Sequence, residues 1–264
     1  IQPEGRRTPF FCVHANGGNV LFYWELARKL GPDQPFYGLQ SPGLDGRSPM
    51  LGSVEEMAAA YLREIRSVQP RGPYLLGGYC LGAYVALEMA RRLEEDGERA
   101  ALVVSLATDG QWRKVSGFLG GIVNHLERMR RMTWRGWAAY LAERLRFRWL
   151  RVKLRVGRAA AEWWLRRGRP MPAGLREFYV FESNYQANLR HVARPIRGRV
   201  AFFKADDALH SAPERFWGEM AGGGLEIHAV PGRDEDIFQE PNVGVLAARL
   251  RESLERAQTA AALR

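Results

Sequence analysis

Short apolar runs alternate regularly with amphipathic segments over the first 110 residues, and this alternation narrows the possible folds. The apolar runs end in glycine-rich or polar turns, as buried strands do, and the segments between them carry apolar residues at helical spacing. The segment at residues 53–65 also opens with a Ser53-x-x-Glu56 capping box. The alternation predicts a mostly parallel sheet with helices on both faces. The expected strands are residues 9–16, 35–43, 73–79 and 101–107, and the expected helices are residues 20–30, 53–65 and 81–97.

Residues 111–190 break this alternation, because they are helical in pattern and rich in arginine and tryptophan. The alternation then returns and continues to the end of the chain. We therefore predict an α/β core made of residues 1–110 and 191–264, with a helical lid inserted at residues 111–190. The later elements expected in the core are strands at residues 199–205 and 225–232 and helices at residues 212–221 and 242–257.

Composition excludes several classes of protein. The 264 residues are 46% hydrophobic, which is ample for a compact core, and no apolar run is long enough to span a bilayer. Two cysteines exclude a disulfide-stapled secreted scaffold and favour a reducing compartment, so we expect a cytoplasmic protein. The polar start without methionine predicts a piece of a longer chain. No grouping of residues has metal-ligand spacing, so we expect no metal site.

The sharpest motif is Gly78-Tyr79-Cys80-Leu81-Gly82, which lies between an expected strand and an expected helix. It has the form G-x-S-x-G with cysteine in place of serine. In a nucleophile elbow, flanking glycines allow a tight strand-to-helix turn that projects a strained nucleophile from the sheet edge. The nucleophile then lies at a helix N-terminus, where the dipole and free N–H groups favour an anion. The alternative is a buried cysteine on a glycine-rich turn, but the flanking strand and helix favour the elbow.

With these motifs the chain resembles, nearly end to end, the thioesterase domains of nonribosomal peptide and polyketide synthases and their stand-alone relatives. FFCVHANGGN is similar to the family's strand and H-P-x-G-G loop, and GPYLLGGYCLGAYVALEMARRLEEDGE to its elbow and following helix. VPGRDEDIF stands where the family has V-P-G-x-H-x-x-x-L. The resemblance implies an α/β hydrolase fold, a mostly parallel sheet with an inserted helical lid, which suits residues 111–190.

The resemblance also implies that all three catalytic positions are altered. Cys80 stands at the position of the nucleophilic serine, Ala107 at that of the triad acid, and Asp234 at that of the histidine. The oxyanion hole is retained in this comparison, because it uses backbone N–H groups, here those of Asn16 and Leu81.

The chemistry of the remaining residue types indicates how such a site works. Without a histidine a serine hydroxyl hardly ionises, but a thiol with a pKa near 8.5 is roughly 3% thiolate at pH 7. Displacement of a carrier thiolate needs little proton transfer, whereas attack by water needs a base. We therefore expect Cys80 to take an acyl, peptidyl or polyketide chain from a carrier-protein thioester. Release would be by transfer to a nucleophile other than water or by cyclisation, with Asp234 assisting or positioning the acceptor.

Two other functions stay open, a catalytically silent docking domain of a synthase and a hydrolytic editing thioesterase with a rearranged base.

Five residues are candidates for a reserve acid or base, each with a structural alternative. Asp109 lies two residues after the acid position and would need a shifted loop. Asp206 and Asp207 end an expected strand, where many other α/β hydrolases keep the triad acid, but such carboxylates also cap helices. His14 lies beside the oxyanion position and is mainly structural in relatives, and His191 would approach from the end of the lid.

Charge is distributed unevenly along the chain. The net charge is +10, and residues 111–170 alone hold 16 Lys and Arg against 3 Asp and Glu. A nucleic-acid-binding domain would not need this segregation. Three interpretations of the segment stay open: solvated lid helices, a docking site for an acidic carrier protein and its phosphopantetheine phosphate, and contact with an anionic membrane. The resemblance favours the carrier over the membrane. The expected partners are thus an acyl or peptidyl carrier protein, the acyl chain and its acceptor, and the only cofactor is the carrier's phosphopantetheine.

Overall fold

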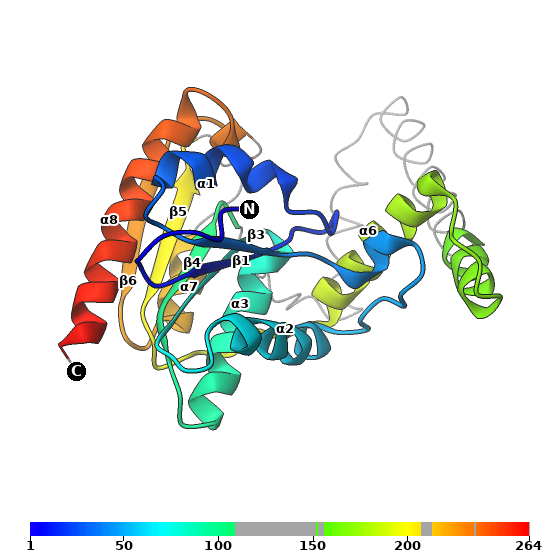
Figure 1. Ribbon diagram of the computed structural model, residues 1–264, viewed down its shortest axis with the longest axis horizontal. Coiled ribbons are helices and arrows are strands. Elements are labelled where there is room, and N and C mark those ends of the chain that lie inside the picture. Colours follow the sequence, from blue (N-terminus) through cyan, green and yellow to red (C-terminus); the bar gives the residue numbers. More distant parts are fainter. Residues whose placement is uncertain (109–151, 153–155, 207–212, 235, 264) are drawn as a thin grey trace, which may run out of the picture.

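The computed structural model describes residues 1–108, 152, 156–206, 213–234 and 236–263. Over these residues the chain forms a sheet of six parallel strands in the order β2-β1-β3-β4-β5-β6 (Figure 1). This confirms the predicted parallel α/β class. The strands are β1 (Phe10–Val13), β2 (Phe36–Leu39), β3 (Tyr74–Tyr79), β4 (Ala100–Leu106), β5 (Val200–Ala205) and β6 (Leu225–Val230).

Helices cover both faces of the sheet. Successive residues of β1 show the division, since Phe10 packs with α1 and α8 on one face and Phe11 packs with α2 and α3 on the other. Trp217, fully buried on α7, belongs to the second face. The two faces form separate apolar cores. The helices of the core are α1 (Trp24–Leu30), α2 (Val54–Val68), α3 (Leu81–Glu95), α7 (Pro213–Met220) and α8 (Asn242–Ala262), with short 3₁₀ turns η1 (Leu21–Tyr23), η2 (Pro42–Asp45) and η3 (Asp236–Phe238).

The expected capping box at the start of α2 is formed in one half. Ser53 Oγ accepts a hydrogen bond from the Glu56 N–H at 3.1 Å, as predicted. The Glu56 carboxylate instead accepts the N–H of Gly52 at 2.6 Å, one residue before the cap. Both bonds satisfy donors that the helix itself cannot pair.

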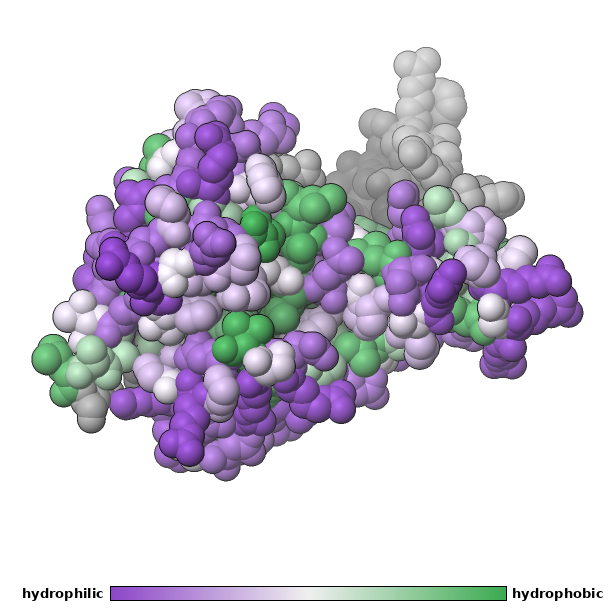
Figure 2. Space-filling model, viewed as in Figure 1, coloured by the Kyte–Doolittle hydropathy of each residue, from purple (hydrophilic) through white to green (hydrophobic). Residues whose placement is uncertain are grey.

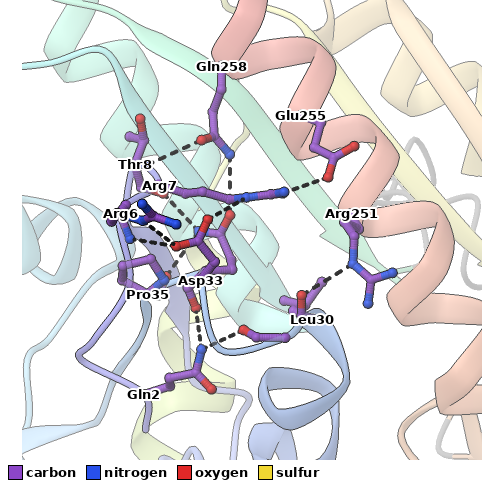
Figure 3. A network of polar contacts seen from close by, with 12 residues as sticks. Gln2, Arg6, Arg7, Thr8, Leu30, Asp33, Pro35, Arg251, Glu255 and Gln258 are labelled. Carbon is purple, nitrogen blue, oxygen red and sulfur yellow. Dashed lines mark hydrogen bonds and ion pairs between the residues drawn. The ribbon is translucent and has the colours of Figure 1, made fainter.

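Polar contacts join the two ends of the core (Figure 3). Arg7 of the N-terminal segment donates to Glu255 on α8 at 2.6 Å, and Arg251 Nε donates to the Leu30 carbonyl at 3.2 Å. Gln2 Nε2 reaches the carbonyls of Gly31 and Gln34. The first residues are thereby fixed against α8 and the end of α1.

The described part of the expected lid contains helical residues 156–166 and α6 (Ala173–Arg190). In Figure 1 these segments extend away from the sheet. Ala161, Met171 and Tyr179 form a small apolar cluster of their own, whereas Ala187 near the end of α6 packs into the core beside α3. The first part of the expected lid, residues 111–151, lies outside the described residues, and the division into core and lid stays a prediction.

Candidate active site

Cys80 occupies the strained turn that a nucleophile elbow requires. Its φ and ψ are 54° and −120°, a positive φ that few non-glycine residues adopt, and it directly precedes α3. A Cβ on Gly78 would lie 2.3 Å from the carbonyl carbon of Gly82, and a Cβ on Gly82 would lie 2.4 Å from the carbonyl oxygen of Val13. The two glycines of the motif are therefore required by close backbone approach. The thiol is partly exposed at the end of β3.

Two side chains from neighbouring strand ends hold the elbow. The Asn16 amide donates from Nδ2 to Cys80 Sγ at 3.5 Å, from the loop after β1. Thr108, just after β4, accepts the Cys80 N–H at 2.9 Å and donates to the Leu106 carbonyl at 2.9 Å. Sequence reasoning missed both side chains. A polar residue at a strand end beside the acid position was the signal for Thr108.

The backbone N–H groups of Asn16 and Leu81 are not used in hydrogen bonds to other described residues. Leu81 is the first residue of α3, whose N–H has no partner within a helix. The Cys80 N–H is occupied by Thr108. This is compatible with the predicted oxyanion hole, whose role stays a prediction.

The loop after β1 is held by α6. Gly18 has a φ of 80°, and a Cβ there would lie 2.5 Å from Val180 Cγ1 on α6. Asn184, fully buried on the same helix, donates to the Asn16 carbonyl at 3.0 Å. A helix that was predicted only as part of a lid thus positions the residue that touches the thiol.

His14 is committed to structural contacts. Its Nδ1 lies 2.7 Å from the Ala15 carbonyl and its Nε2 lies 2.7 Å from the Tyr61 hydroxyl. Burial lowers the pKa of His14 to about 4, partly offset by the bond to Ala15. A neutral ring with both nitrogens bound supports the structural interpretation over the reserve base.

The position where the resemblance predicts the triad acid has an unusual backbone. Ala107 has a φ of 38°, and its N–H donates to the Phe203 carbonyl at 2.8 Å. Its side chain is a methyl group, and its assignment to the acid position stays a prediction. Asp109 and Asp207 lie outside the described residues. Asp206 is exposed at the end of β5, with its N–H bound to the Val230 carbonyl.

Asp234 lies in the loop between β6 and η3, at the same carboxyl edge of the sheet as Cys80. Aromatic packing joins this loop to the elbow, because the Phe238 ring lies 5.1 Å from that of Tyr79 and 5.1 Å from that of Phe22. Asn242 also donates to the Asp236 carbonyl at 3.3 Å. The contacts hold the loop next to the residue that precedes the thiol.

The other described histidines have partners away from the elbow. His191 Nδ1 lies 2.7 Å from Glu55 Oε1, at the end of α6 and about 10 Å along the helix axis from Asn184. His228 contacts Ser253 on α8 at 3.1 Å. His125 and His210 lie outside the described residues. The contact of His191 with Glu55 does not support its role as a reserve acid or base, which stays a prediction.

The two cysteines differ in environment. Cys12 is fully buried on β1, and burial raises the pKa of its thiol well above the ordinary value. Cys80 lies at the helix N-terminus with a polar donor. Among the residues that the structure describes, no cluster of three potential ligands could hold a metal ion, and no helix is long and apolar enough to cross a membrane.

Comparison with known proteins identifies the family. The thioesterase domain model matches residues 8–142, just over half of the chain. The chain therefore belongs to the thioesterase domain family.

Its relatives by sequence include large synthetases. Malpinin synthetase of Mortierella alpina is 44% identical over 116 residues, which are 44% of this chain and 2% of that protein. The dimodular nonribosomal peptide synthase of Bacillus subtilis (strain 168) is 42% identical over 106 residues, which are 40% of this chain and 4% of that protein. The chain thus spans only a small part of the length of these relatives.

Solved structures show the same fold. A covalent complex of the NocB thioesterase domain with a fluorophosphonate nocardicin G analog matches with a TM-score of 0.67 and 22% identity, over 96% of this chain and 97% of that one. The four-domain nonribosomal peptide synthetase holo-AB3403 matches with a TM-score of 0.69 and 20% identity, over 96% of this chain and 20% of that one. These likenesses confirm the α/β hydrolase fold predicted from the sequence.

Proposed function

We propose that this domain accepts an acyl, peptidyl or polyketide chain from a carrier-protein thioester onto Cys80. It then releases the chain to a nucleophile other than water, or by cyclisation. The observation that carries the proposal is the backbone of the elbow, where Cys80 has a φ of 54° directly before α3. Strained residues of this kind persist only where the surrounding structure holds them, and they cluster at active sites, ligand clamps and switch regions.

Acylation is a thiol exchange. The Cys80 thiolate attacks the thioester carbonyl carbon, a new carbon–sulfur bond forms, and the bond to the carrier's phosphopantetheine sulfur breaks. The leaving thiolate takes up a proton from water. The N–H groups of Asn16 and Leu81 would bind the negative oxygen of the intermediate, where each such donor contributes about 10²–10³-fold to the rate.

Deacylation is the step that distinguishes this site from a hydrolase. The family's histidine position holds Asp234, and the described histidines have partners elsewhere. A water molecule would lack the imidazole that normally removes its proton. An amine, thiol, hydroxyl or carbon nucleophile stronger than water would resolve the acyl-enzyme. Asp234 would take its proton or hold a cationic acceptor.

Apolar surface beside the site suits an acyl chain. Leu21 on η1 is 73% exposed, and Phe181 and Tyr185 on α6 are largely exposed and stack at 6.3 Å. These elements flank the loop that carries Asn16. In the view of Figure 2, hydrophobic surface lies in the middle of the molecule with polar surface on either side.

The carrier is expected to dock on the arginine-rich segment of residues 111–170. Arg158, Arg166, Arg167 and Arg169 belong to the described part of the arginine-rich segment, and Arg167 lies 3.7 Å over the Trp163 ring. An acidic carrier with a phosphopantetheine phosphate complements such a surface.

The test is to incubate the protein with acyl-pantetheine thioesters and follow its intact mass, with Cys80→Ala as the control. We expect a persistent acyl adduct on the wild-type chain and none on the variant. Absence of any adduct would overturn the proposal in favour of a silent docking domain. Rapid turnover without accumulation would favour a hydrolytic enzyme.

A further inference from the structure

Asn16 makes a contact that the proposed chemistry above does not use. Its side-chain nitrogen donates to Cys80 Sγ at 3.5 Å, a distance within hydrogen-bonding range for the large sulfur atom. The backbone role of this residue, as an oxyanion donor, is separate from this contact. The carboxamide therefore touches the atom that must become negative for acylation to begin.

The amide is oriented by a second asparagine. Asn184 on α6 is fully buried and donates to the Asn16 carbonyl at 3.0 Å. Close contact of Val180 with Gly18 seats the same helix on the same loop. The backbone of Asn16 is thus fixed from outside the loop, which limits where its side chain can reach.

Only one end of the Asn16 carboxamide has a hydrogen-bond partner among the described residues. Its Oδ1 is buried and has no hydrogen-bond partner among the described residues, and the same is true of Asn184 Oδ1. Most buried side-chain polar atoms in folded proteins are paired, and a catalytic role is one of the recognised explanations for an exception. Here the paired end of Asn16 is the one that reaches the sulfur.

We propose that the Asn16 carboxamide, held by Asn184, stabilises the thiolate of Cys80 and so supplies part of the activation that the family's histidine would give. Asn16 is then a catalytic residue, and Asn184 a positioning residue that acts through it. A hydrogen bond to the charged form favours that form, and it adds to the field of the α3 N-terminus. The proposal rests on the proposed role of Cys80 as nucleophile, and it adds the device by which a chain without the imidazole raises its thiolate fraction.

The test is the pH dependence of Cys80 alkylation by iodoacetamide, followed by intact mass. Cys12 does not interfere, because it is fully buried and its thiol pKa is raised. Asn16→Ala removes the donor. Asn16→Asp replaces it with a negative charge of the same shape. Asn184→Asp keeps the shape on α6 but removes the donor to the Asn16 carbonyl.

We expect Asn16→Ala to raise the apparent pKa of Cys80 by about 1, which slows alkylation at pH 7 about tenfold. Asn16→Asp should raise it further, and Asn184→Asp should give a smaller rise in the same direction. Asn19→Ala in the same loop and Asn188→Ala on α6 are the matched controls and should leave the wild-type profile. Circular dichroism confirms that each variant is folded, and Asn184→Asp keeps the test decisive if a change at Asn16 prevents folding.

Coincident profiles for the wild type and the folded variants would overturn the proposal, since a merely structural asparagine would not move the profile. This failure differs from that of the proposed function. The alkylation profile is measured without any thioester, whereas the proposed function fails if the wild-type thiol accepts no acyl group.

Discussion

Two regions of the candidate active site differ in what is unusual about them. In the loop after β1 and the elbow after β3 it is the backbone, with glycines in close contact and a strained Cys80. In the turns after β4 and β6, where the sequence resemblance predicts the triad acid and histidine, it is the side chains, because the chain has Ala107 and Asp234 there. The β4 turn also has a positive φ at Ala107. The elbow therefore depends on backbone shape, whereas the other two turns depart from the expected pattern in their side chains.

The largest effect should come from the glycines of the elbow. Gly82→Ala places a methyl group 2.4 Å from the Val13 carbonyl oxygen, so either the strand or the helix must move. We expect a loss of several kcal/mol in the free energy of unfolding or a failure to fold, measured by urea titration. Gly244→Ala on α8 is the matched control, because nothing lies within 4 Å of that site, and it should gain up to about 1 kcal/mol. Equal stability of the two variants would mean that the elbow is looser than described.

The second prediction compares sulfur with oxygen as the nucleophilic atom at position 80. Cys80→Ser restores the family's nucleophile but not its base, so the hydroxyl should stay protonated. We expect acylation by an acyl-pantetheine thioester to be at least about 100-fold slower than in the wild type, measured by intact mass against time. A serine variant that acylates as fast as the wild type would show that a base is present beside the elbow.

The third effect concerns pH and the buried His14. Its folded-state pKa is about 4, below the ordinary value of 6.5, so the unfolded chain binds more protons between these values. Stability should be complete above pH 6.5 and be lost as the pH falls toward 4, by about 2 kcal/mol from pH 7 to pH 5. Urea titrations at several pH values measure this slope, and His14→Gln should flatten it. An unchanged slope in the variant would assign the pH dependence to other groups.

The smallest effect is expected at Thr108, which connects the turn after β4 to the elbow. Thr108→Val removes the hydroxyl that accepts the Cys80 N–H and donates to the Leu106 carbonyl, with little change in size. We expect a loss of about 1 kcal/mol, because a half-buried N–H is left unpaired. Thermal unfolding measures it, and Thr8→Val, near the surface, is a matched control. Equal thermal stability of the two variants would show that the Thr108 hydroxyl does not couple the β4 turn to the elbow.

Much of this arrangement could be predicted from the sequence, because it follows from periodicity and glycine spacing. The alternation of strands and helices and the elbow at Gly78–Gly82 are local patterns with one structural solution. The Asn16 side-chain contact and its support by Asn184 could not be predicted. The first contact joins residues 64 positions apart and the second joins residues 168 positions apart, and nothing local to either asparagine indicates them.

The expected N–H donors and the aromatic packing of Phe238 against Tyr79 could be predicted only in part. The motif placed Leu81 after the nucleophile, but which N–H groups stay unpaired depends on Thr108 in another strand. The loop at Asp234 was located by its Pro-Gly start, while its attachment to the elbow depends on side chains 159 residues apart. Tertiary contacts of this kind carry no sequence signature in one chain.

We propose above that a thiol in an intact elbow forms an acyl-enzyme that water does not readily resolve. The lifetime of acyl-Cys80, loaded from an acyl-pantetheine thioester, tests this in buffer alone and with increasing primary amine. We expect a long-lived adduct in buffer, a lifetime that shortens in proportion to the amine, and hydrolysis about 10²-fold faster in Asp234→His. An adduct that hydrolyses rapidly in buffer and ignores the amine would contradict it.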